Sequence, residues 1–582
     1  MLLSAAVCLS AQQPALSQPQ SIVVTGAAVP IPLSEADRDV SILSLPANER
    51  PLFDSWFDLL QLDPALDLRQ RSPGGFIADL SIRGATFGQT LVLLNGLRLN
   101  DSQTGHFNLD LPVPLEMVSA IEVLKGSGST LYGSDAIGGV VNVRTQPLEA
   151  PSLRILTGIG NFGTNQQHLI GSLGGPRVSE EVAVARDFSS GFAPNRDYRN
   201  LALSSLTSLR SSLGATSLLL AYSDRPYGAD QFYGNYPSWE RIKTWFGSLH
   251  QSLGSHTEAT VAYRRHTDLF VLFRDRPKIY TNRHLLDSWQ GDLRRHDDLP
   301  GHAVLSYGVE GLSDSIHSTN LGVRSRTRGS GYAFYDIRAL HRFGFSAGMR
   351  EEVYGSGQVA TSPSVSGTAW LSSRFKLRAS ASRAFRLPSY TDLYYSDPGN
   401  RGNPNLRPES ATSYEAGLDA LLRTNLRASL TVFQRRSTDG IDYVRANTAS
   451  VWQATNFDRL HFTGVEAVTE IRHFSVSFAA LRGVPASPAV LQSKYAFNYA
   501  VHSGVVEWHG ALFHKVVART RVGVIDRVDR GPYAIWDASA SYATGHVRPF
   551  LQLRNLGNTD YQEIPSVKMP GRGILGGLEF VL

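Results

Sequence analysis

The sequence has one cysteine, Cys8, among 582 residues. It lies in residues 1–17, an apolar, small-residue segment that resembles a secretory signal with a cleavage region near Ala15. The segment lacks the basic residues that normally open such a signal, which indicates a truncated start. If the signal is removed, the mature chain has no cysteine, and disulfide frameworks and thiolate metal sites are excluded.

Charge is also scarce. Charged residues make up 18% of the chain, against about 25% in an ordinary soluble protein. No apolar run approaches the roughly 20 residues that a membrane-spanning helix needs. Low charge with 10% aromatic residues suits strands that alternate between lipid and water. The net charge of +5 is scattered without a basic cluster, so nucleic-acid binding is not expected.

From residue 148 to residue 582 the sequence follows one pattern, in which apolar and polar side chains alternate within segments of about ten residues. Leu426, Ala428, Leu430 and Val432 share one face of such a segment, opposite Arg427. Inward charges would disrupt a β-sandwich core but suit a water-filled lumen. No blade-length repeat supports a soluble propeller or solenoid. We predict an all-β transmembrane barrel of about 22 antiparallel strands, whose lumen at that size holds a plug.

Residues 49–147 mix short strands with turns and one helix, predicted over residues 50–60. Residues 91–99 predict a tight hairpin whose turn is Asn95-Gly96. This region is therefore expected to form a small α+β plug domain in the lumen. Residues 18–48 are rich in proline, serine and alanine and lack a period, which indicates a flexible leader.

Several motifs carry a family resemblance. In the predicted plug they are Leu-Ser-Ile-Arg-Gly at 80–84, Ile-Glu-Val-Leu-Lys-Gly at 121–126 and Leu-Tyr-Gly-Ser-Asp-Ala-Ile-Gly-Gly at 131–139. In the predicted barrel they are residues 384–394, 402–409, 555–558 and 569–572. Over nearly its whole length the chain resembles the TonB-dependent outer-membrane receptors, nearest to their cobalamin branch. It departs at Phe580-Val581-Leu582, because the family commonly ends in an aromatic residue that the barrel-assembly machinery reads.

The resemblance implies an active transporter, not an enzyme, in the bacterial outer membrane. The favoured ligand is cobalamin or another corrinoid, with a ferric siderophore or haem as the alternative. The implied partners are the inner-membrane energy-coupling protein TonB with ExbB and ExbD, the small-molecule ligand, outer-membrane lipids and the barrel-assembly machinery. No cofactor or metal site is expected: a calcium site needs clustered oxygen ligands, and Asp187, Asp197 and Asp230 are too dispersed.

Two sets of functional residues follow from the resemblance. Ile22, Val23, Val24, Thr25 and Gly26 look like the box that TonB grips, and such a run suits strand addition to a partner sheet. Arg83 and Lys125 match the plug cations that pair with barrel carboxylates, here Glu415 and Glu466. A lysine stands at 125 where many members have arginine, and a lysine ammonium lacks the planar fork that binds a carboxylate through two parallel hydrogen bonds. Ordinary solvated lumen charges are the alternative interpretation.

Ligand contacts are expected from plug and barrel loops that face outward. Exposed aromatic rings beside polar groups suit a large, planar, amphipathic ligand. The candidates are Arg71, Phe76, Asp101, Gln103, His106 and Phe107 in the plug, and Tyr227, Tyr233, Tyr394 and Tyr395 in the barrel. Packing at the membrane girdle or within loops is the alternative for each aromatic residue, and a structural role is the alternative for His106.

Two other classes of protein are weighed against a transporter. A passive porin would need neither plug nor coupling box. An outer-membrane hydrolase would need a catalytic motif, and no His-Glu-x-x-His motif occurs in the sequence.

Overall fold

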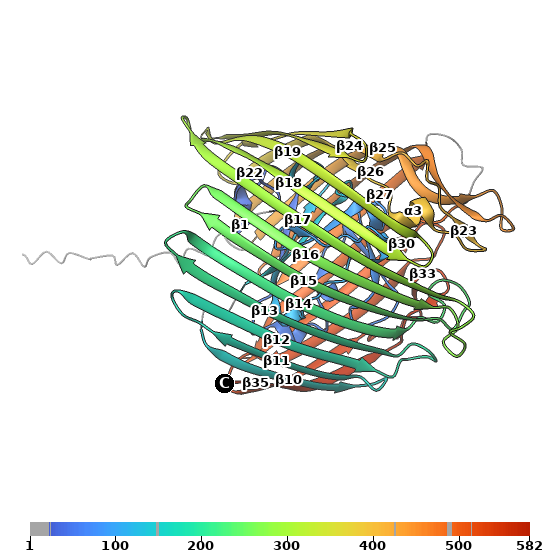
Figure 1. The fold of residues 1–582 in the computed structure, drawn as a ribbon. Coiled ribbons are helices and arrows are strands. Elements are labelled where there is room, and N and C mark those ends of the chain that lie inside the picture. Colours follow the sequence, from blue (N-terminus) through green and yellow to red (C-terminus); the bar gives the residue numbers. More distant parts are fainter. Residues whose placement is uncertain are drawn as a thin grey trace, which may run out of the picture.

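The structure of the chain is a computed structural model that describes residues 22–23, 25–146, 150–340, 342–423, 426–485, 492–513 and 515–582. The predicted signal segment, Cys8 and Val24 lie outside these residues. Figure 1 shows a wide barrel of tilted strands around a smaller domain built from the N-terminal part of the chain. Among the described residues, no helix has the length and apolar character needed to cross a membrane.

The barrel wall closes by antiparallel pairing, and its first strand pairs with its last. In the described part of the chain, 22 long strands form this wall, as the alternation predicted. They are β10 (Ser152–Gly160), β11 (Asn165–Leu173), β12 (Val178–Ser189), β13 (Tyr198–Ser211), β14 (Gly214–Gly228), β15 (Trp239–Leu253), β16 (Thr257–Val271), β17 (Thr281–Leu299), β18 (Ala303–Ser318), β19 (Gly322–Leu340), β20 (Phe343–Tyr354), β21 (Gln358–Trp370), β22 (Phe375–Arg386), β24 (Glu409–Arg423), β25 (Leu426–Arg445), β26 (Trp452–Ile471), β27 (Phe474–Pro485), β29 (Ala500–Phe513), β30 (Val516–Arg527), β31 (Tyr533–Tyr542), β32 (Val547–Arg554) and β35 (Gly573–Val581).

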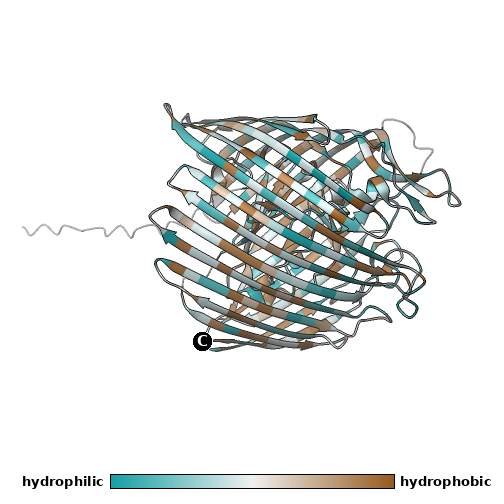
Figure 2. Cartoon of the chain, in the orientation of Figure 1, coloured by the Kyte–Doolittle hydropathy of each residue, from teal (hydrophilic) through white to brown (hydrophobic). Residues whose placement is uncertain are grey.

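Side chains alternate across the wall. On β25, Leu430 and Val432 are 47% and 50% exposed on the outer face, whereas Thr431 and Arg435 are buried on the inner face. Figure 2 shows apolar and polar bands alternating along the strands. An apolar outer face is required because lipid tails offer no hydrogen-bond partners. The predicted barrel, apolar outside and polar inside, is therefore confirmed.

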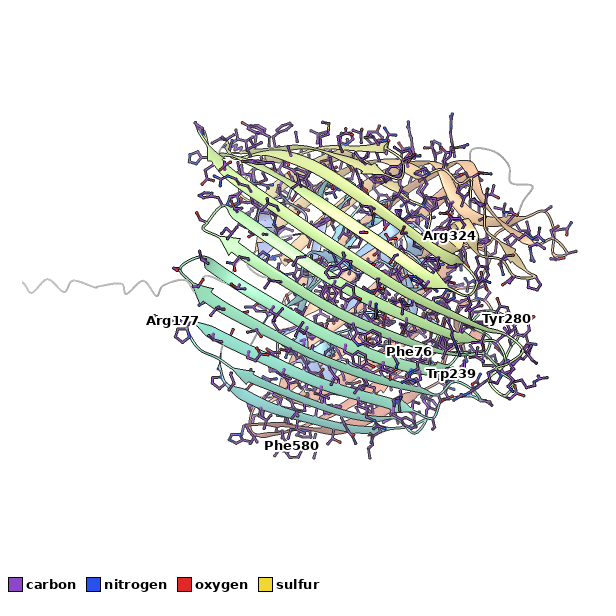
Figure 3. The ribbon with its side chains drawn as sticks, viewed as in Figure 1. Phe76, Arg177, Trp239, Tyr280, Arg324 and Phe580 are labelled. Carbon is purple, nitrogen blue, oxygen red and sulfur yellow. The ribbon has the colours of Figure 1, made fainter. Side chains whose placement is uncertain are left out.

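The two ends of the barrel differ. At one end short turns join the strands, and Figure 3 places Arg177 and Phe580 there. At the other end lie longer loops, with Trp239, Tyr280 and Arg324 toward that side in Figure 3. The ends are called the short-turn end and the long-loop end. The long-loop end carries the remaining short elements of the barrel: α3 (Tyr390–Tyr394), β23 (Asn400–Arg401), β28 (Gln492–Ser493), β33 (Gln562–Ile564) and β34 (Val567–Lys568).

The plug is built on a five-stranded sheet and a separate strand pair. The sheet has the order β3 (Val40–Ser44), β8 (Val118–Lys125), β9 (Gly139–Thr145), β6 (Thr90–Leu94) and β7 (Leu97–Arg98), and the pair is β4 (Leu66–Gln70) with β5 (Ala78–Ile82). The short elements are β1 (Ile22–Val23), β2 (Ile31–Pro32), α1 (Phe57–Leu60), α2 (Ser129–Tyr132), η1 (Leu33–Glu35), η2 (Arg50–Leu52), η3 (Phe87–Gln89), η4 (Gly105–Phe107) and η5 (Leu115–Met117).

The predicted hairpin is present. Leu94 of β6 pairs with Leu97 of β7, and Asn95 and Gly96 connect them with φ values of 52° and 83°. Two consecutive positive φ angles are what a two-residue hairpin turn needs, and Asn-Gly adopts them readily. Beneath the sheet, Phe57, Leu59 and Ile82 are fully buried in a core that extends to apolar residues of the barrel wall.

Two predictions about the N-terminal region were wrong. Residues 40–44, assigned to the flexible leader, form the edge strand β3, where Val40 pairs with Leu124 of β8. The helix predicted over residues 50–60 divides into η2 and α1, because Phe53 between them has extended backbone angles. The Asp58 carboxylate, in the first turn of α1, accepts the backbone N–H of Asp54 at 2.8 Å, so the segment between the two pieces bonds to the second helix instead of continuing the first.

Candidate functional site

A cluster of charges joins the plug to the barrel wall around Arg83, which follows β5. Its Nε and Nη2 atoms donate to the two carboxylate oxygens of Glu466 on β26, at 2.7 Å and 2.8 Å. Its Nη1 donates to Glu415 on β24 at 2.9 Å. Its Nη2 also donates at 2.8 Å to Asp39, in the plug just before β3. Arg83 and Gly84 have φ values of 51° and 70°, a turn that aims the side chain at the wall.

Lys125, at the end of β8, lies in the same cluster with different partners. Its Nζ is 2.9 Å from Asp63, a plug residue, and 3.7 Å and 4.0 Å from Glu466 and Asp39. Burial opposes charge on this amine, but the three carboxylates outweigh it and raise its pKa. Lys125 therefore pairs most closely with a plug carboxylate, and its contact with the barrel carboxylate of Glu466 is longer.

The structure thus brings together all four residues named for the plug–barrel cluster. Their side chains are almost completely buried. Burial would raise the pKa of Asp39, but Arg378, Lys125 and Arg83 together hold it well below its usual range. If Arg83 were removed, two buried carboxylates would lose their main partner. Leaving charges unpaired in a site without water lowers the stability of the folded state strongly. Sequence reasoning missed Asp39 and Asp63, because nothing in their spacing indicates a partner far along the chain.

The predicted energy-coupling box lies against the plug. Ile22 and Val23 form β1, which pairs with β2, and Val24 is outside the described residues. Thr25 is buried, and its backbone N–H and its hydroxyl both donate to the Glu122 carboxylate, at 2.8 Å and 2.6 Å. The Asn142 amide donates to the Thr25 hydroxyl at 3.0 Å. Gly26, next along the chain, is half-buried.

Six of the ten predicted ligand contacts, Arg71 among them, are buried in this structure. Phe76 packs on Tyr198 and Tyr227, with ring centroids 5.0 Å and 4.8 Å apart. Asp101 accepts from Arg264 at 2.9 Å, and Gln103 donates to Asp268 at 2.9 Å. Phe107 packs on His266 and Tyr227 donates to Glu240. Spacing did not reveal this burial, because loop sequence does not say which way a side chain points.

The other predicted contacts lie nearer the long-loop end. Arg71 is buried against Asp79 at 3.0 Å, whereas Tyr233, over which its guanidinium lies, is 39% exposed. His106 Nδ1 is 2.7 Å from Asp79, and burial lowers the pKa of its ring despite that carboxylate, which favours the neutral imidazole. Tyr394 and Tyr395 are half-buried beside Tyr390 of α3, and the Arg324 guanidinium lies over the Tyr394 ring. Among the described residues no His, Cys, Asp and Glu side chains are grouped so as to hold a metal ion.

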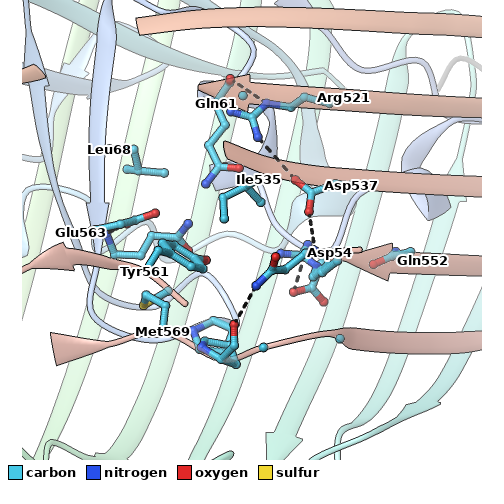
Figure 4. A pocket seen from close by; sticks show the side chains of 18 of the residues that line it. Asp54, Gln61, Leu68, Arg521, Ile535, Asp537, Gln552, Tyr561, Glu563 and Met569 are labelled. Carbon is cyan, nitrogen blue, oxygen red and sulfur yellow. Dashed lines mark hydrogen bonds and ion pairs between the residues drawn. The ribbon is translucent and has the colours of Figure 1, made fainter. Parts of the chain in front are cut away.

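A cavity of about 1340 Å³, its open mouth included, lies between the plug and the barrel wall. Plug residues of β4 and of the segments next to it form one side, and the barrel side includes β30, β31, β32 and β35 and residues 161–164, 189–198, 503–505 and 555–571. Figure 4 shows Leu68 and Gln61 of the plug facing Ile535, Tyr561 and Met569 across this space. Sequence reasoning missed this cavity, because its lining comes from the plug and from several barrel segments that are distant from one another along the chain.

Comparisons with known proteins agree with this architecture. Residues 161–556 match the family described as "TonB dependent receptor-like, beta-barrel", and residues 32–140 match "TonB-dependent Receptor Plug Domain". The "Vitamin B12 transporter BtuB" of Photobacterium profundum is 26% identical over 90% of this chain and 93% of that protein. The "Iron-regulated outer membrane virulence protein" of Vibrio cholerae serotype O1 is also 26% identical, over 79% of this chain and 76% of that protein.

Among solved structures, the siderophore receptor PirA from Acinetobacter baumannii superposes with a TM-score of 0.74 over 93% of this chain and 98% of that chain. At 15% identity this likeness shows the fold alone. The barrel match covers more than half of the sequence, and the plug match lies inside the observed barrel. The chain therefore belongs to the TonB-dependent receptor family, the plugged β-barrels of the bacterial outer membrane that transport small-molecule ligands with energy supplied through TonB.

Proposed function

We propose that this receptor imports cobalamin or another corrinoid. The observation that carries the proposal is the end-to-end similarity to the vitamin B12 transporter of Photobacterium profundum, which spans nearly all of both chains. The similarity to the iron-regulated protein of Vibrio cholerae has the same identity but covers smaller shares of both chains.

The long-loop end supports a planar ligand. Tyr233 and Tyr236 are 39% and 43% exposed there, and the Arg324 guanidinium lies over the ring of Tyr394. Aromatic faces next to polar groups bind ligands that are themselves broad, flat and partly polar. A ferric siderophore or haem is the second candidate, favoured by the similarity to the iron-regulated relative.

In the proposed cycle, ligand binding at the long-loop end frees the box from the plug. TonB, driven by ExbB and ExbD, then takes up the box as an added strand and pulls. The barrel-assembly machinery inserts the protein, and outer-membrane lipids cover its apolar face. We propose that the cycle uses no resident cofactor, so that a calcium chelator outside the cell leaves uptake unchanged.

Uptake in a strain that lacks its own corrinoid and siderophore receptors tests the ligand. Radiolabelled cyanocobalamin should enter, and excess unlabelled cyanocobalamin, but not a ferric siderophore, should compete. The Val23→Pro variant should bind ligand yet import none, because proline removes a backbone donor from the added strand. Competition by the siderophore alone would assign the iron function instead, and full uptake by Val23→Pro would reject coupling through this segment.

A further inference from the structure

On β22 and β27 the outward side chains change from apolar to charged at the same height. On each strand, four apolar residues face outward before an arginine, which is the ninth residue from the short-turn end. On β22 Arg383 follows Phe375, Leu377, Ala379 and Ala381. On β27 Arg482 follows Phe474, Val476, Phe478 and Ala480. The apolar outer face therefore ends at one level on these two strands.

This level is the outer edge of the apolar band that faces lipid. Strands rise about 3.3 Å per residue and tilt by about 40°, so eight residues climb roughly 20 Å. The apolar band of such barrels is about 25 Å tall. Short turns face the periplasm and longer loops face the outside of the cell. Arg383 and Arg482 therefore lie at the headgroups of the outer leaflet of the membrane.

A third arginine joins these two through the strands between them, which Figure 1 shows along one part of the wall. Arg383 pairs with Thr412 of β24, which pairs with Arg436 of β25. Gln434, the outward residue before Arg436, pairs with Thr463 of β26, which pairs with Arg482. Neighbouring strands are about 4.8 Å apart, so consecutive arginines stand roughly 10–12 Å apart along the wall. The set is called the arginine row and comprises Arg383, Arg436 and Arg482 with Thr412, Gln434, His461 and Thr463 between them.

The three arginines are exposed, and none has a carboxylate partner among the residues that the structure describes. Another arc of the wall differs. Arg241 on β15 donates to both carboxylate oxygens of Asp224 on β14, at 2.8 Å and 2.6 Å. Arg265 on β16 donates to both oxygens of Asp287 on β17, at 2.7 Å and 3.0 Å. That arc supplies its own counter-charges, whereas the arc that carries the arginine row does not.

Aromatic residues confirm the height. Arg265 is also the ninth residue of its strand, and Tyr263, the outward residue before it, packs on Trp289 with ring centroids 4.5 Å apart. Tyrosine and tryptophan gather where the apolar band meets the headgroups. Beside the arginine row, Tyr414 is 46% exposed and holds the corresponding place on β24, two residues from Thr412 toward the short-turn end. The row therefore begins just beyond this boundary.

Exposed guanidinium groups at headgroup level, without a carboxylate on the wall, suit an anion that the membrane itself supplies. The planar fork of arginine matches two oxygens of a phosphate, which is the anion of lipid headgroups. The neutral hydrogen-bonding groups of Thr412, Gln434 and Thr463 stand between the arginines, where sugar hydroxyls would meet them.

We propose that the arginine row is a docking surface for a phosphorylated glycolipid of the outer leaflet. Arg383, Arg436 and Arg482 bind its phosphates, and the polar side chains between them contact its sugars. The surface lies on the outside of the wall, away from the plug, so the proposal does not depend on which ligand the receptor imports.

Binding of lipid A to the full-length receptor in a mild detergent tests this surface, with bound lipid measured by native mass spectrometry. The triple variant Arg383→Gln, Arg436→Gln and Arg482→Gln should bind lipid A about tenfold more weakly, because charged hydrogen bonds to phosphate are lost. The matched control, Arg199→Gln, Arg241→Gln and Arg265→Gln, removes the same charge from the outer face of the other arc and should bind as the wild type. Equal binding by all three proteins, or an equal loss in both variants, would overturn the proposal.

A second measurement uses the wild-type protein and so does not depend on how the variants fold. Lipid A should bind about tenfold more tightly than its dephosphorylated form, because the arginines recognise phosphate. Excess phosphatidylglycerol should not displace it, because that lipid lacks the sugars that contact the row. Equal affinity for the dephosphorylated form would overturn the phosphate contact. Displacement by phosphatidylglycerol would overturn the assignment to a glycolipid.

Discussion

At the scale of single residues, attachment of the plug depends most on Arg83. One guanidinium donates to Glu466, Glu415 and Asp39, and its flat face also lies 4.3 Å from the ring centroid of Phe433. A lysine cannot reproduce this, because it is a point charge without a planar fork. The neighbouring Lys125 does not substitute for it either, since its nearest carboxylate belongs to the plug.

Replacing Arg83 with alanine should loosen the plug in the barrel. Breaking a buried ion pair by removing one partner costs about 3–5 kcal/mol, because the other charges stay buried. We expect cells with Arg83→Ala to become sensitive to an antibiotic too large for general porins, and Arg83→Lys to be intermediate. Arg265→Ala breaks an ion pair on the exposed outer face and is the matched control. Unchanged sensitivity in Arg83→Ala would show that the cluster does not hold the plug.

Glu563 makes the loop of residues 555–572, which docks on the plug where Glu563 accepts the Gln70 backbone N–H, sensitive to pH. Burial raises its pKa to about 7, against the opposing hydrogen bond from Gln70 and the charge of Arg527. An undocked, solvated Glu563 titrates near 4.5, so the docked loop binds its proton more tightly. Docking is therefore favoured as the pH falls from about 7 toward 4.5, and weakened above pH 7.

A nitroxide attached at exposed Lys568→Cys measures this directly. The label should be less mobile at pH 6 than at pH 8, because protonation removes the cost of a buried charge. Adding Glu563→Gln, which is uncharged at both pH values, should give the immobile spectrum throughout. If the double variant keeps the pH dependence, another group controls the loop.

At the scale of elements, local signals were predictable and distant partnerships were not. Asn95-Gly96 marks a turn whatever surrounds it, so the β6–β7 hairpin followed from the sequence. The strand β3 did not, because its partner β8 lies about 80 residues away and its own five residues resemble leader sequence. Motif resemblance placed Arg83 near Glu466, but Asp63 beside Lys125 depends on how the plug folds.

The hydrogen bonds of Thr25 hold the box to the plug, and a substitution at this residue tests their contribution. Thr25→Val keeps the shape of the side chain but removes the hydroxyl that donates to Glu122 and accepts from Asn142. Asn142 then loses this acceptor and Glu122 loses one hydrogen bond, although Glu122 keeps those from the Thr25 backbone N–H and from Arg144. Losing a buried hydrogen bond in this way costs about 1–3 kcal/mol. The purified receptor should therefore bind the periplasmic domain of TonB about tenfold more tightly without ligand. Thr25→Ser retains the hydroxyl and should behave as the wild type, and equal affinities for all three would mean that Thr25 does not restrain the box.

At the scale of the whole molecule, the barrel that forms a wide pore and the plug that closes it are separate domains of one chain. The wall closes on itself through β10 and β35, so its hydrogen bonding does not require the plug. Its lumen is lined by charged side chains such as Arg350 and Glu352 that bind water readily once the plug is gone. The plug in turn blocks the lumen by packing and by charge pairs, without a covalent link other than the chain itself.

Removing residues 18–147 should therefore convert a closed receptor into an open pore. In planar lipid bilayers the full-length protein should show almost no conductance, while the barrel alone should conduct steadily, because a barrel of this width encloses an aqueous channel when nothing fills it. Arg83→Ala should fall between them, with brief openings as the plug shifts against the wall. A plugless barrel that inserts and heat-denatures like the wild type but does not conduct would mean that the wall collapses inward, and that the plug is needed to hold the pore open.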